Sequence, residues 1–414
     1  MKKIFNTILI ILAMQYIISL FSIAEEDQFF GKYYTFKSQL NGKVMDATYY
    51  SLQQNESRLS DSQKFLLIAA SDVTKPGSLA ASYYIISKPT SLAICIHKNA
   101  AYGWLPEKNE KSLKTKISLL MEDEEPNPVK DFYGNVILLS KYIGVTGQKW
   151  KLQKLSGSDN GYYAIYAYGI NNKAIGSYEV PGDEKGNILR IFNWENNSSQ
   201  KWEISAAENA PISDLAEPVI DQGWIYEDLP SLNSFNQNMP TSTTPRLVSD
   251  EYIPYIYIKC DGAGPNKAST NPWYVLRFEQ FWKKIETFEF DGIRTQKDEY
   301  KISISEETLN AFDEKIDETL SAGIKAGYRN IVNLGIDGSW NKQNITKNGT
   351  TEGSIFEKTQ KIEYYPGIRK YACIYQMIDR YSILNIDGNQ VCEPIEIPTG
   401  ITHEVYYAEK VKFQ

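Results

Sequence analysis

Histidine and cysteine are both scarce in this chain of 414 residues, which contains two of the first and four of the second. With only His97 and His403, neither a Ser-His-Asp or Cys-His catalytic arrangement nor a histidine-based metal site is expected. The cysteines are too few for a disulfide scaffold and include no CxxC pair that would suggest zinc. We therefore expect no catalytic residues, no metal ion and no cofactor.

Nucleotide-binding motifs and basic clusters are also missing from the sequence. No P-loop is present, and no GxGxxG opens a helix after a strand. The net charge of −7 argues against a nucleic-acid partner and against purely electrostatic adhesion to anionic lipid. Paired carboxylates such as Glu306-Glu307 leave a glycosidase open, but they lie among lysines, which favours solvated surface. We expect that the protein is not an enzyme.

One long apolar run is present, at the N-terminus. Met1-Lys2-Lys3 precedes an apolar stretch from Ile4 to Leu20, and Ser22-Ile23-Ala24 supplies small residues for a signal peptidase. A membrane anchor is the alternative, but the acidic Glu25-Glu26-Asp27 follows at once. We predict a signal peptide at 1–24, whose removal changes the charge from −7 to −9 because Lys2 and Lys3 are lost. The mature protein is expected to be secreted.

Three similar triplets stand out in the first half of the chain: Gln63-Lys64-Phe65, Gln148-Lys149-Trp150 and Gln200-Lys201-Trp202. Such Gln-x-aromatic triplets are typical of β-trefoil lectins of the ricin B-chain type, in which the rings share one core. We predict this fold for residues 27–205, with Phe65, Trp150 and Trp202 in the core. The triplets are 85 and then 52 residues apart, so the second unit carries an insertion, for which residues 122–128 are the candidate.

Ricin-type units hold sugars with an aspartate on an early turn and a nearby aromatic ring. The first unit has the run Asn41 to Asp46 in this position, and in the third unit Gly176 replaces the aspartate, so that site is expected to be altered. The candidate carbohydrate-binding residues are Asp46, Tyr49, Tyr50 and Gln63 in the first unit, and Trp194 and Asn196, with Asn197 beside them, in the third. For the triplet residues, a structural role is the favoured interpretation.

The second half of the chain follows a small, polar linker at 206–216 and is dominated by β-forming residues from 217 to 414. A helix is an alternative at Trp273–Ile285, where aromatic and charged residues mix. Residues 385–389 predict a hairpin turn. Cys373 and Cys392 flank this turn, so they could form a disulfide across strands, and two buried thiols are equally compatible.

Apolar and polar residues alternate between Leu320 and Ile336. This length and period suit one strand of a transmembrane barrel, although an ordinary amphipathic strand shows the same pattern. The residues assigned to the lipid-facing side of this pore strand are Leu320, Ile324, Tyr328, Val332 and Leu334. A polar stretch and a weaker returning strand within 354–365 would complete a hairpin.

Both halves together resemble the binary insecticidal toxin family, which includes the mosquitocidal binary toxins. The segment from Asn271 to Trp282 is similar to an aromatic signature of that family, and the lead-in at 253–256 and the region 397–400 also look alike. The resemblance implies a trefoil followed by an aerolysin-like pore-forming domain, hence an all-β chain. It also implies toxicity to insect cells, often with a second toxin protein. The signal peptide departs from members that are stored as crystals in the cell.

Two functions follow as hypotheses. The first is a secreted toxin whose trefoil binds a cell-surface glycoprotein or glycolipid and whose C-terminal domain forms an oligomeric β-barrel pore in the target membrane. The second is a non-lytic subunit that binds the receptor and recruits a separate toxic partner. A secreted glycosidase ranks behind both.

Overall fold

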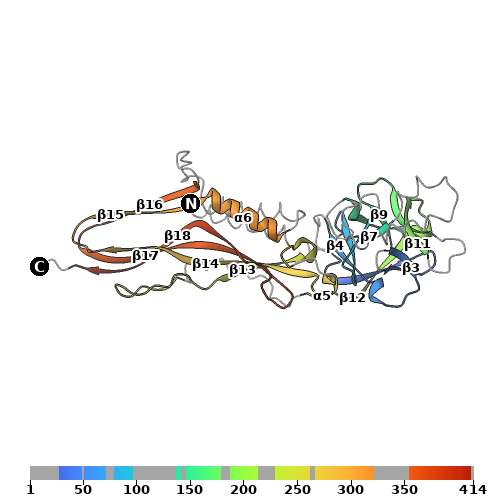
Figure 1. Cartoon of the computed structure of the whole chain (residues 1–414), viewed down its shortest axis with the longest axis horizontal. Coiled ribbons are helices and arrows are strands. Elements are labelled where there is room, and N and C mark those ends of the chain that lie inside the picture. The colour runs from blue at the N-terminus through green and yellow to red at the C-terminus, as the bar shows by residue number, and fades with distance from the viewer. Residues whose placement is uncertain are drawn as a thin grey trace, which may run out of the picture.

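The chain folds into an elongated molecule with a compact group of short strands at one end and long strands that run to the other end (Figure 1). We describe a computed structural model, which places residues 28–48, 51–70, 79–96, 137–140, 146–178, 187–212, 229–261, 266–320 and 354–411. Strands dominate both parts, so the predicted all-β class is confirmed.

The N-terminal part contains strands β1 to β12. Their bounds are β1 (Lys32–Ser38), β2 (Val44–Thr48), β3 (Ser51–Asn55), β4 (Phe65–Ala69), β5 (Tyr83–Ser87), β6 (Ala93–Ile96), β7 (Ile137–Ser140), β8 (Lys149–Lys154), β9 (Tyr162–Ala167), β10 (Lys173–Tyr178), β11 (Asn187–Asn193) and β12 (Lys201–Asn209). Antiparallel pairing closes β1, β4, β5, β8, β9 and β12 into a ring. The hairpins β2–β3, β6–β7 and β10–β11 cap this ring. The arrangement is a β-trefoil, and its closed ring leaves no unpaired edge.

The three triplet aromatics lie in one buried cluster at the centre of the trefoil. Phe65, Trp150 and Trp202 are all 0% exposed. Both indoles also donate to a backbone carbonyl of a cap hairpin: Trp150 Nε1 to Ile94 O (3.0 Å) and Trp202 Nε1 to Ile175 O (3.1 Å). Each ring therefore ties a barrel strand to the cap of its own unit.

The triplet glutamines hold the backbone that precedes them. In the first and third units, Nε2 donates to the carbonyl seven residues earlier and Oε1 accepts from the N–H five residues earlier. The partners are Glu56 O and Arg58 N for Gln63, and Asn193 O and Glu195 N for Gln200. Each glutamine ends a 3₁₀ turn: η1 (Asp61–Gln63), η3 (Thr146–Gln148) and η5 (Ser198–Gln200). A further turn, η4 (Gly157–Asp159), joins β8 to β9.

One boundary differs from the prediction, and the predicted insertion falls outside the described residues. Strand β12 pairs with β1 as far as Asn209, and Ala210 is buried, so residues 206–210 belong to the trefoil and not to the linker. The insertion expected around 122–128 lies outside the described residues, which place it between β6 and β7, inside the second cap hairpin.

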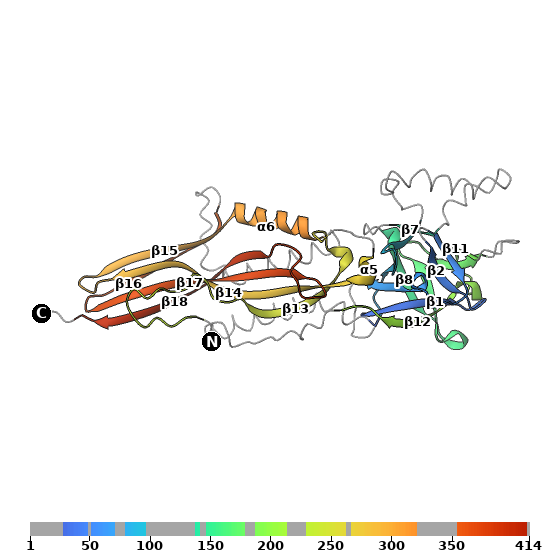
Figure 2. The ribbon, with the colours of Figure 1, turned by 60° about the horizontal axis from the view of Figure 1, so that its bottom comes forward.

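The C-terminal part is built on an antiparallel sheet of four strands in the order β13 (Arg246–Pro254), β14 (Trp273–Phe290), β17 (Ile368–Leu384) and β18 (Ile395–Lys410). A separate ribbon pairs β15 (Gln296–Ser305) with β16 (Ser354–Tyr364). The described residues of this part also form two one-turn helices, η6 (Tyr255–Tyr257) and α5 (Lys267–Thr270), and one longer helix, α6 (Glu306–Thr319). Figure 2 shows the long strands running along the molecule with α6 on their outside. Among the described residues, no helix is both long and apolar enough to cross a membrane.

The helix considered for Trp273–Ile285 was wrong, because this segment forms most of β14. All of its residues from Trp273 to Leu276 are buried, and β14 pairs with β13 on one side and β17 on the other. Aromatic and β-branched side chains suit such a central strand. By contrast, the charged residues from Glu306 onward, including the pair Glu306-Glu307, form the helix α6, which begins where Ser305 Oγ accepts from Thr308 N.

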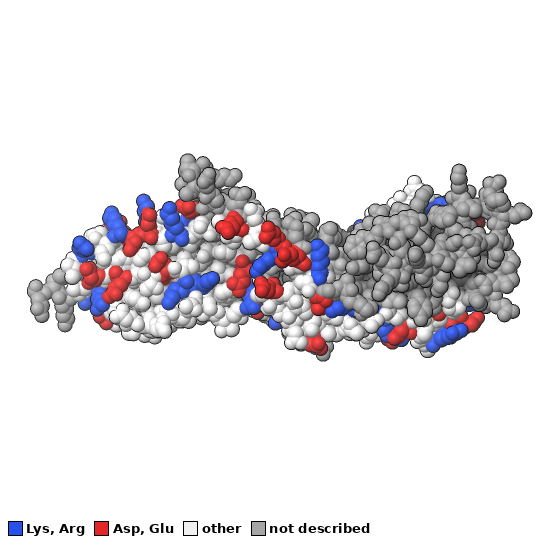
Figure 3. All heavy atoms as spheres, viewed as in Figure 1, with Lys and Arg blue, Asp and Glu red and all other residues white. Residues whose placement is uncertain are grey.

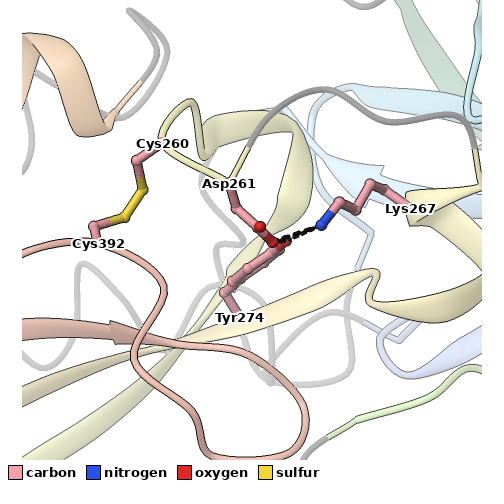
Figure 4. The surroundings of a disulfide bond; sticks show 5 residues. All are labelled: Cys260, Asp261, Lys267, Tyr274 and Cys392. Carbon is pink, nitrogen blue, oxygen red and sulfur yellow. Dashed lines mark hydrogen bonds and ion pairs between the residues drawn. A yellow bond between two sulfur atoms is a disulfide. The ribbon is translucent and has the colours of Figure 1, made fainter.

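The predicted turn is confirmed, whereas the disulfide considered for Cys373 and Cys392 is wrong. Asn385 Oδ1 accepts from Asp387 N and Asn389 N, and Gly388 has a φ of +80°. Cys373 lies inside β17, where it is a buried free thiol opposite Val405. Cys392 is bonded instead to Cys260, 132 residues away in sequence (Figure 4).

A buried contact joins the two parts. Ser91 of the trefoil accepts from Ala268 N through Oγ (2.8 Å) and from Tyr255 OH through its carbonyl (3.0 Å). Tyr33 OH donates to Ala268 O, and the Phe30 ring packs on Trp273 with centroids 4.7 Å apart. The trefoil is thus seated on α5 and the start of β14.

Candidate carbohydrate-binding site

Asp46 is the carboxylate that the sequence predicts to bind sugar in the first unit of the trefoil. It lies on β2 opposite Gln53 of β3, and because side chains alternate along a strand, Asn55 projects from the same face. Asp46 Oδ2 accepts from Asn55 Nδ2 and from Gln63 Nε2, both at 3.1 Å. The structure therefore brings Asp46 and Gln63 together and adds Asn55, which the sequence reasoning missed.

The second carboxylate oxygen of Asp46 is free to accept. Asp46 is 4% exposed, and its Oδ1 has no hydrogen-bond donor among the described residues. A buried polar atom without a partner costs about 1–3 kcal/mol, so such atoms are rare in folded proteins unless a ligand or water satisfies them. Two side chains orient the carboxylate and leave one oxygen for a hydroxyl donor.

The other two units do not repeat this arrangement. The carbonyls that accept from the two tryptophans belong to Ile94 and Ile175, which correspond to Met45 of the first unit. The residues that follow them, Cys95 and Gly176, therefore occupy the position of Asp46. Cys95 is buried and is not part of a disulfide. A carboxylate is thus present in the first unit alone at this position.

The space beside Gly176 is filled by an aromatic ring. Phe192 pairs with Ala174 as Asn55 pairs with Val44, so Phe192 replaces the asparagine of the first unit. A Cβ added at Gly176 would lie 2.9 Å from Phe192 Cδ2 and 3.1 Å from Gln200 Cγ. The third unit has neither the acceptor nor the room for this type of site.

The remaining candidate sugar ligands are placed elsewhere. Trp194 is half-buried, with its ring 5.5 Å from that of Tyr166, and Asn196 is exposed with a left-handed φ of 58°. No contact among the described residues joins them to Asp46. Tyr49 and Tyr50 lie outside the described residues.

The pore strand lies almost entirely outside the described residues. Its first residue, Leu320, follows α6, is 1% exposed and forms an isolated bridge with Ile258. The residues Ile324, Tyr328, Val332 and Leu334 are not described. The returning segment is a strand, β16, but its described partner is β15. The segment 306–353 is therefore inserted between two paired strands.

The surface of the C-terminal part carries charges of both signs. On the face drawn in Figure 3, Lys and Arg side chains lie among Asp and Glu side chains over the long strands. On the β15–β16 ribbon the two signs pair across strands, as in Lys297–Glu363 (2.9 Å) and Lys301–Glu357 (3.3 Å).

Comparisons with known proteins agree with this architecture. No family model matches the sequence, and no curated protein sequence does either. Among solved structures, Cry35Ab1 is similar with a TM-score of 0.51 and 14% identity, over 91% of this chain and 90% of that chain. The two proteins thus share a fold along most of their length.

Partial matches include two further structures. A mosquitocidal holotoxin matches with a TM-score of 0.28 and 16% identity, over 42% of this chain and 16% of that chain. A ricin B-like lectin of Macrolepiota procera, in complex with lactose, matches with a TM-score of 0.27 and 11% identity, over 42% of this chain and 95% of that chain.

Proposed function

We propose that this protein is a secreted toxin that binds cell-surface glycans through its trefoil and forms oligomeric β pores through its C-terminal domain. The observation that carries this proposal is the likeness in fold to Cry35Ab1, a binary insecticidal toxin, along both domains. The protein acts by binding and membrane insertion, not by catalysis.

Asp46 supports the glycan-binding step. A carboxylate oxygen that is oriented by Asn55 and Gln63 and still lacks a donor suits a sugar hydroxyl. The ligand is a cell-surface glycoprotein or glycolipid, and it is bound at the first unit, because the counterparts of Asp46 in the other units are replaced.

The insertion between β15 and β16 supports the pore-forming step. Strands that cross a membrane must satisfy every backbone group, so a hairpin from each of several copies has to close into one barrel. The segment that begins at Leu320 has the alternating pattern for such a hairpin, and the insertion that contains it, residues 306–353, leaves and re-enters the fold at one end of a paired ribbon.

The test is planar-bilayer conductance of the mature chain alone, before and after limited proteolysis. Stepwise currents are expected. The variant Ile324→Asp places a charge on the lipid-facing side and is expected to abolish conductance while glycan binding stays intact. The matched control is Lys325→Asp on the lumen-facing side, which should conduct with altered ion selectivity. Normal conductance of Ile324→Asp would reject the assigned strand.

The second candidate is a non-lytic subunit that recruits a toxic partner. The same trefoil and the same likeness to one protein of a binary system favour it. No conductance across the bilayer with or without proteolysis, together with retained glycan binding, would favour this function over pore formation.

A further inference from the structure

Residues 258–260 connect parts of the C-terminal domain that are far apart in sequence. Ile258 bridges to Leu320, and Lys259 N donates to Thr319 O (2.8 Å), so both hold the end of α6. Cys260 is bonded to Cys392 in the loop between β17 and β18. One short stretch therefore fastens the exit of α6 to that loop.

The next residue anchors the same stretch from the other side. Asp261 Oδ2 accepts from Lys267 Nζ (2.5 Å) and from Tyr274 OH (Figure 4). Lys267 begins α5, whose Ala268 contacts the trefoil, and Tyr274 lies in β14. This side of the stretch is thus held by hydrogen bonds and an ion pair, whereas the side toward the β17–β18 loop is held by the disulfide.

Among the described side chains of helix α6, the buried ones lie at its C-terminal end. Of its described side chains, Ile316 and Thr319 are buried, and the others are at least partly exposed. Its ion pair Lys315–Glu393 spans 3.7 Å with both side chains exposed, a type of contact that adds little to stability because water screens it. Ile316 belongs with Leu320 to a buried apolar cluster, against which Cys392 packs.

The disulfide beside this cluster is within reach of a reductant. Cys260 is exposed and Cys392 is half-buried, whereas Cys95 and Cys373, which are outside the disulfide, are 1% and 0% exposed. Accessibility is one of the conditions for thiol–disulfide exchange. An external thiol would therefore meet this pair first.

We propose that the Cys260–Cys392 disulfide is a redox-operated latch on the end of α6. The thiolate of a small dithiol or a dithiol protein attacks Cys260 Sγ, the S–S bond breaks, and Cys392 leaves as a thiolate that takes up a proton. The second thiol of the reductant then displaces Cys260, which is also protonated. Two electrons pass to the protein, and the reductant ends as its own disulfide.

Reduction leaves residues 258–259 without their covalent tie to the β17–β18 loop, and the bridge to Leu320 weakens. The latch itself does not depend on what the protein does. Its consequence rests on the proposed function, because the predicted pore strand begins at Leu320. With the latch reduced, membrane permeabilisation is expected to be faster.

Hydrogen exchange of the full-length protein in graded dithiothreitol tests the latch, with iodoacetamide labelling to count the thiols formed. When Cys260 and Cys392 become labelled, the amides of Lys259 and Leu320 are expected to exchange at least about tenfold faster. The paired amides of β14 and β17 should keep their protection. Unchanged exchange at Lys259 and Leu320, or loss of protection across β14 and β17 in the same step, would overturn the proposal.

Variants separate the latch from general effects of reductant. The double variant Cys260→Ser with Cys392→Ser should show the faster exchange without reductant and no further response to it. Cys373→Ala removes a buried thiol that is outside the latch and should respond as the original chain does. Wild-type protection in the double variant would reject the latch. Failure of every form to permeabilise membranes, with the exchange response intact, would reject the pore and leave the latch standing.

Discussion

Gln280 on β14 donates a hydrogen bond of 2.6 Å to Asp379 directly opposite on β17, and both side chains are buried in the middle of the long sheet. Burial raises the pKa of Asp379 from its ordinary 3.8 to about 7, while the hydrogen bond from Gln280 opposes this rise. The carboxyl is therefore more easily protonated in the folded chain than in the unfolded chain.

This relationship predicts that Asp379 makes the fold less stable as the pH rises. Because the folded pKa lies above the unfolded one, the protonated carboxyl favours folding below pH 4, and this contribution is lost as the pH rises from 4 to 7. The variant Asp379→Asn keeps the acceptor for Gln280 and removes the titration. It should be more stable than the original chain at pH 8, by ~2–4 kcal/mol, and equal to it at pH 4.

Denaturant unfolding at several pH values measures this difference. Other carboxyls have a lowered pKa, as Asp61 does beside Lys88 and Lys64. Their contribution to the stability of the fold is lost as the pH falls, which is the opposite direction. They act equally in both proteins, so they cancel in the comparison. Parallel stability curves for the two proteins would contradict the assigned titration.

The Asp46 cluster predicts one dominant glycan site. Asp46→Asn removes the charge and presents an amide to two donors, so glycan affinity should fall at least ~tenfold. Asn55→Ala should weaken binding through loss of one orienting donor. The measurement is an array of N-glycans and glycolipid headgroups, followed by calorimetry with the strongest ligand. Glu195→Gln, an exposed carboxylate in the third unit, is the control and should bind normally.

If Asp46→Asn binds glycans as the original chain does, Asp46 is not the sugar ligand. The next candidates are then Tyr166 and Trp194, whose rings pack together in the third unit. Thermal unfolding without ligand verifies that each variant is folded. Loss of binding together with loss of the unfolding transition would count as a stability effect and not as a ligand effect.

Much of the trefoil could be predicted because each of its repeats carries a short sequence pattern whose residues interact with near neighbours in the chain. A glutamine must reach backbone groups five and seven residues earlier, and an aromatic ring must follow it at a fixed offset, so the triplets stay recognisable. The hairpin register that adds Asn55 to Asp46 is less visible, because it depends on the length of the β2–β3 turn.

The C-terminal domain was predicted less well because its contacts are long-range. Cys260 and Cys392 are 132 residues apart, and spacing alone cannot choose between pairings. Strand β14 mixes charged and apolar residues because it is central at one end and half-exposed at the other, which obscures its period. For α6 the local signal was present: Ser305 as N-cap followed by Glu306 and Glu307.

The buried glutamine of the third unit predicts a large and local loss of stability. Gln200→Leu leaves Asn193 O and Glu195 N without their partner, at a cost of ~2–4 kcal/mol for the two groups. Gln153→Leu on β8, an exposed position, is the control and should change stability by less than ~0.5 kcal/mol. Calorimetric unfolding compares the two. Equal small losses would mean that water replaces the glutamine.

Substitutions at Gly176 and Phe192 are expected to have coupled effects on the stability of the trefoil. Gly176 does not have a positive φ and lies in β10, where alanine would ordinarily stabilise a strand by ~0.5–1 kcal/mol. Here the added Cβ meets Phe192 at 2.9 Å, so Gly176→Ala should instead destabilise the trefoil by ~1–3 kcal/mol. Phe192→Leu removes the opposing ring edge and should recover part of that loss. A double-mutant cycle by denaturant unfolding measures the coupling, expected at ~0.5–3 kcal/mol. Additive losses would show that Phe192 is not what closes the third unit, and that the close approach of Gln200 Cγ, 3.1 Å from the added Cβ, limits the space instead.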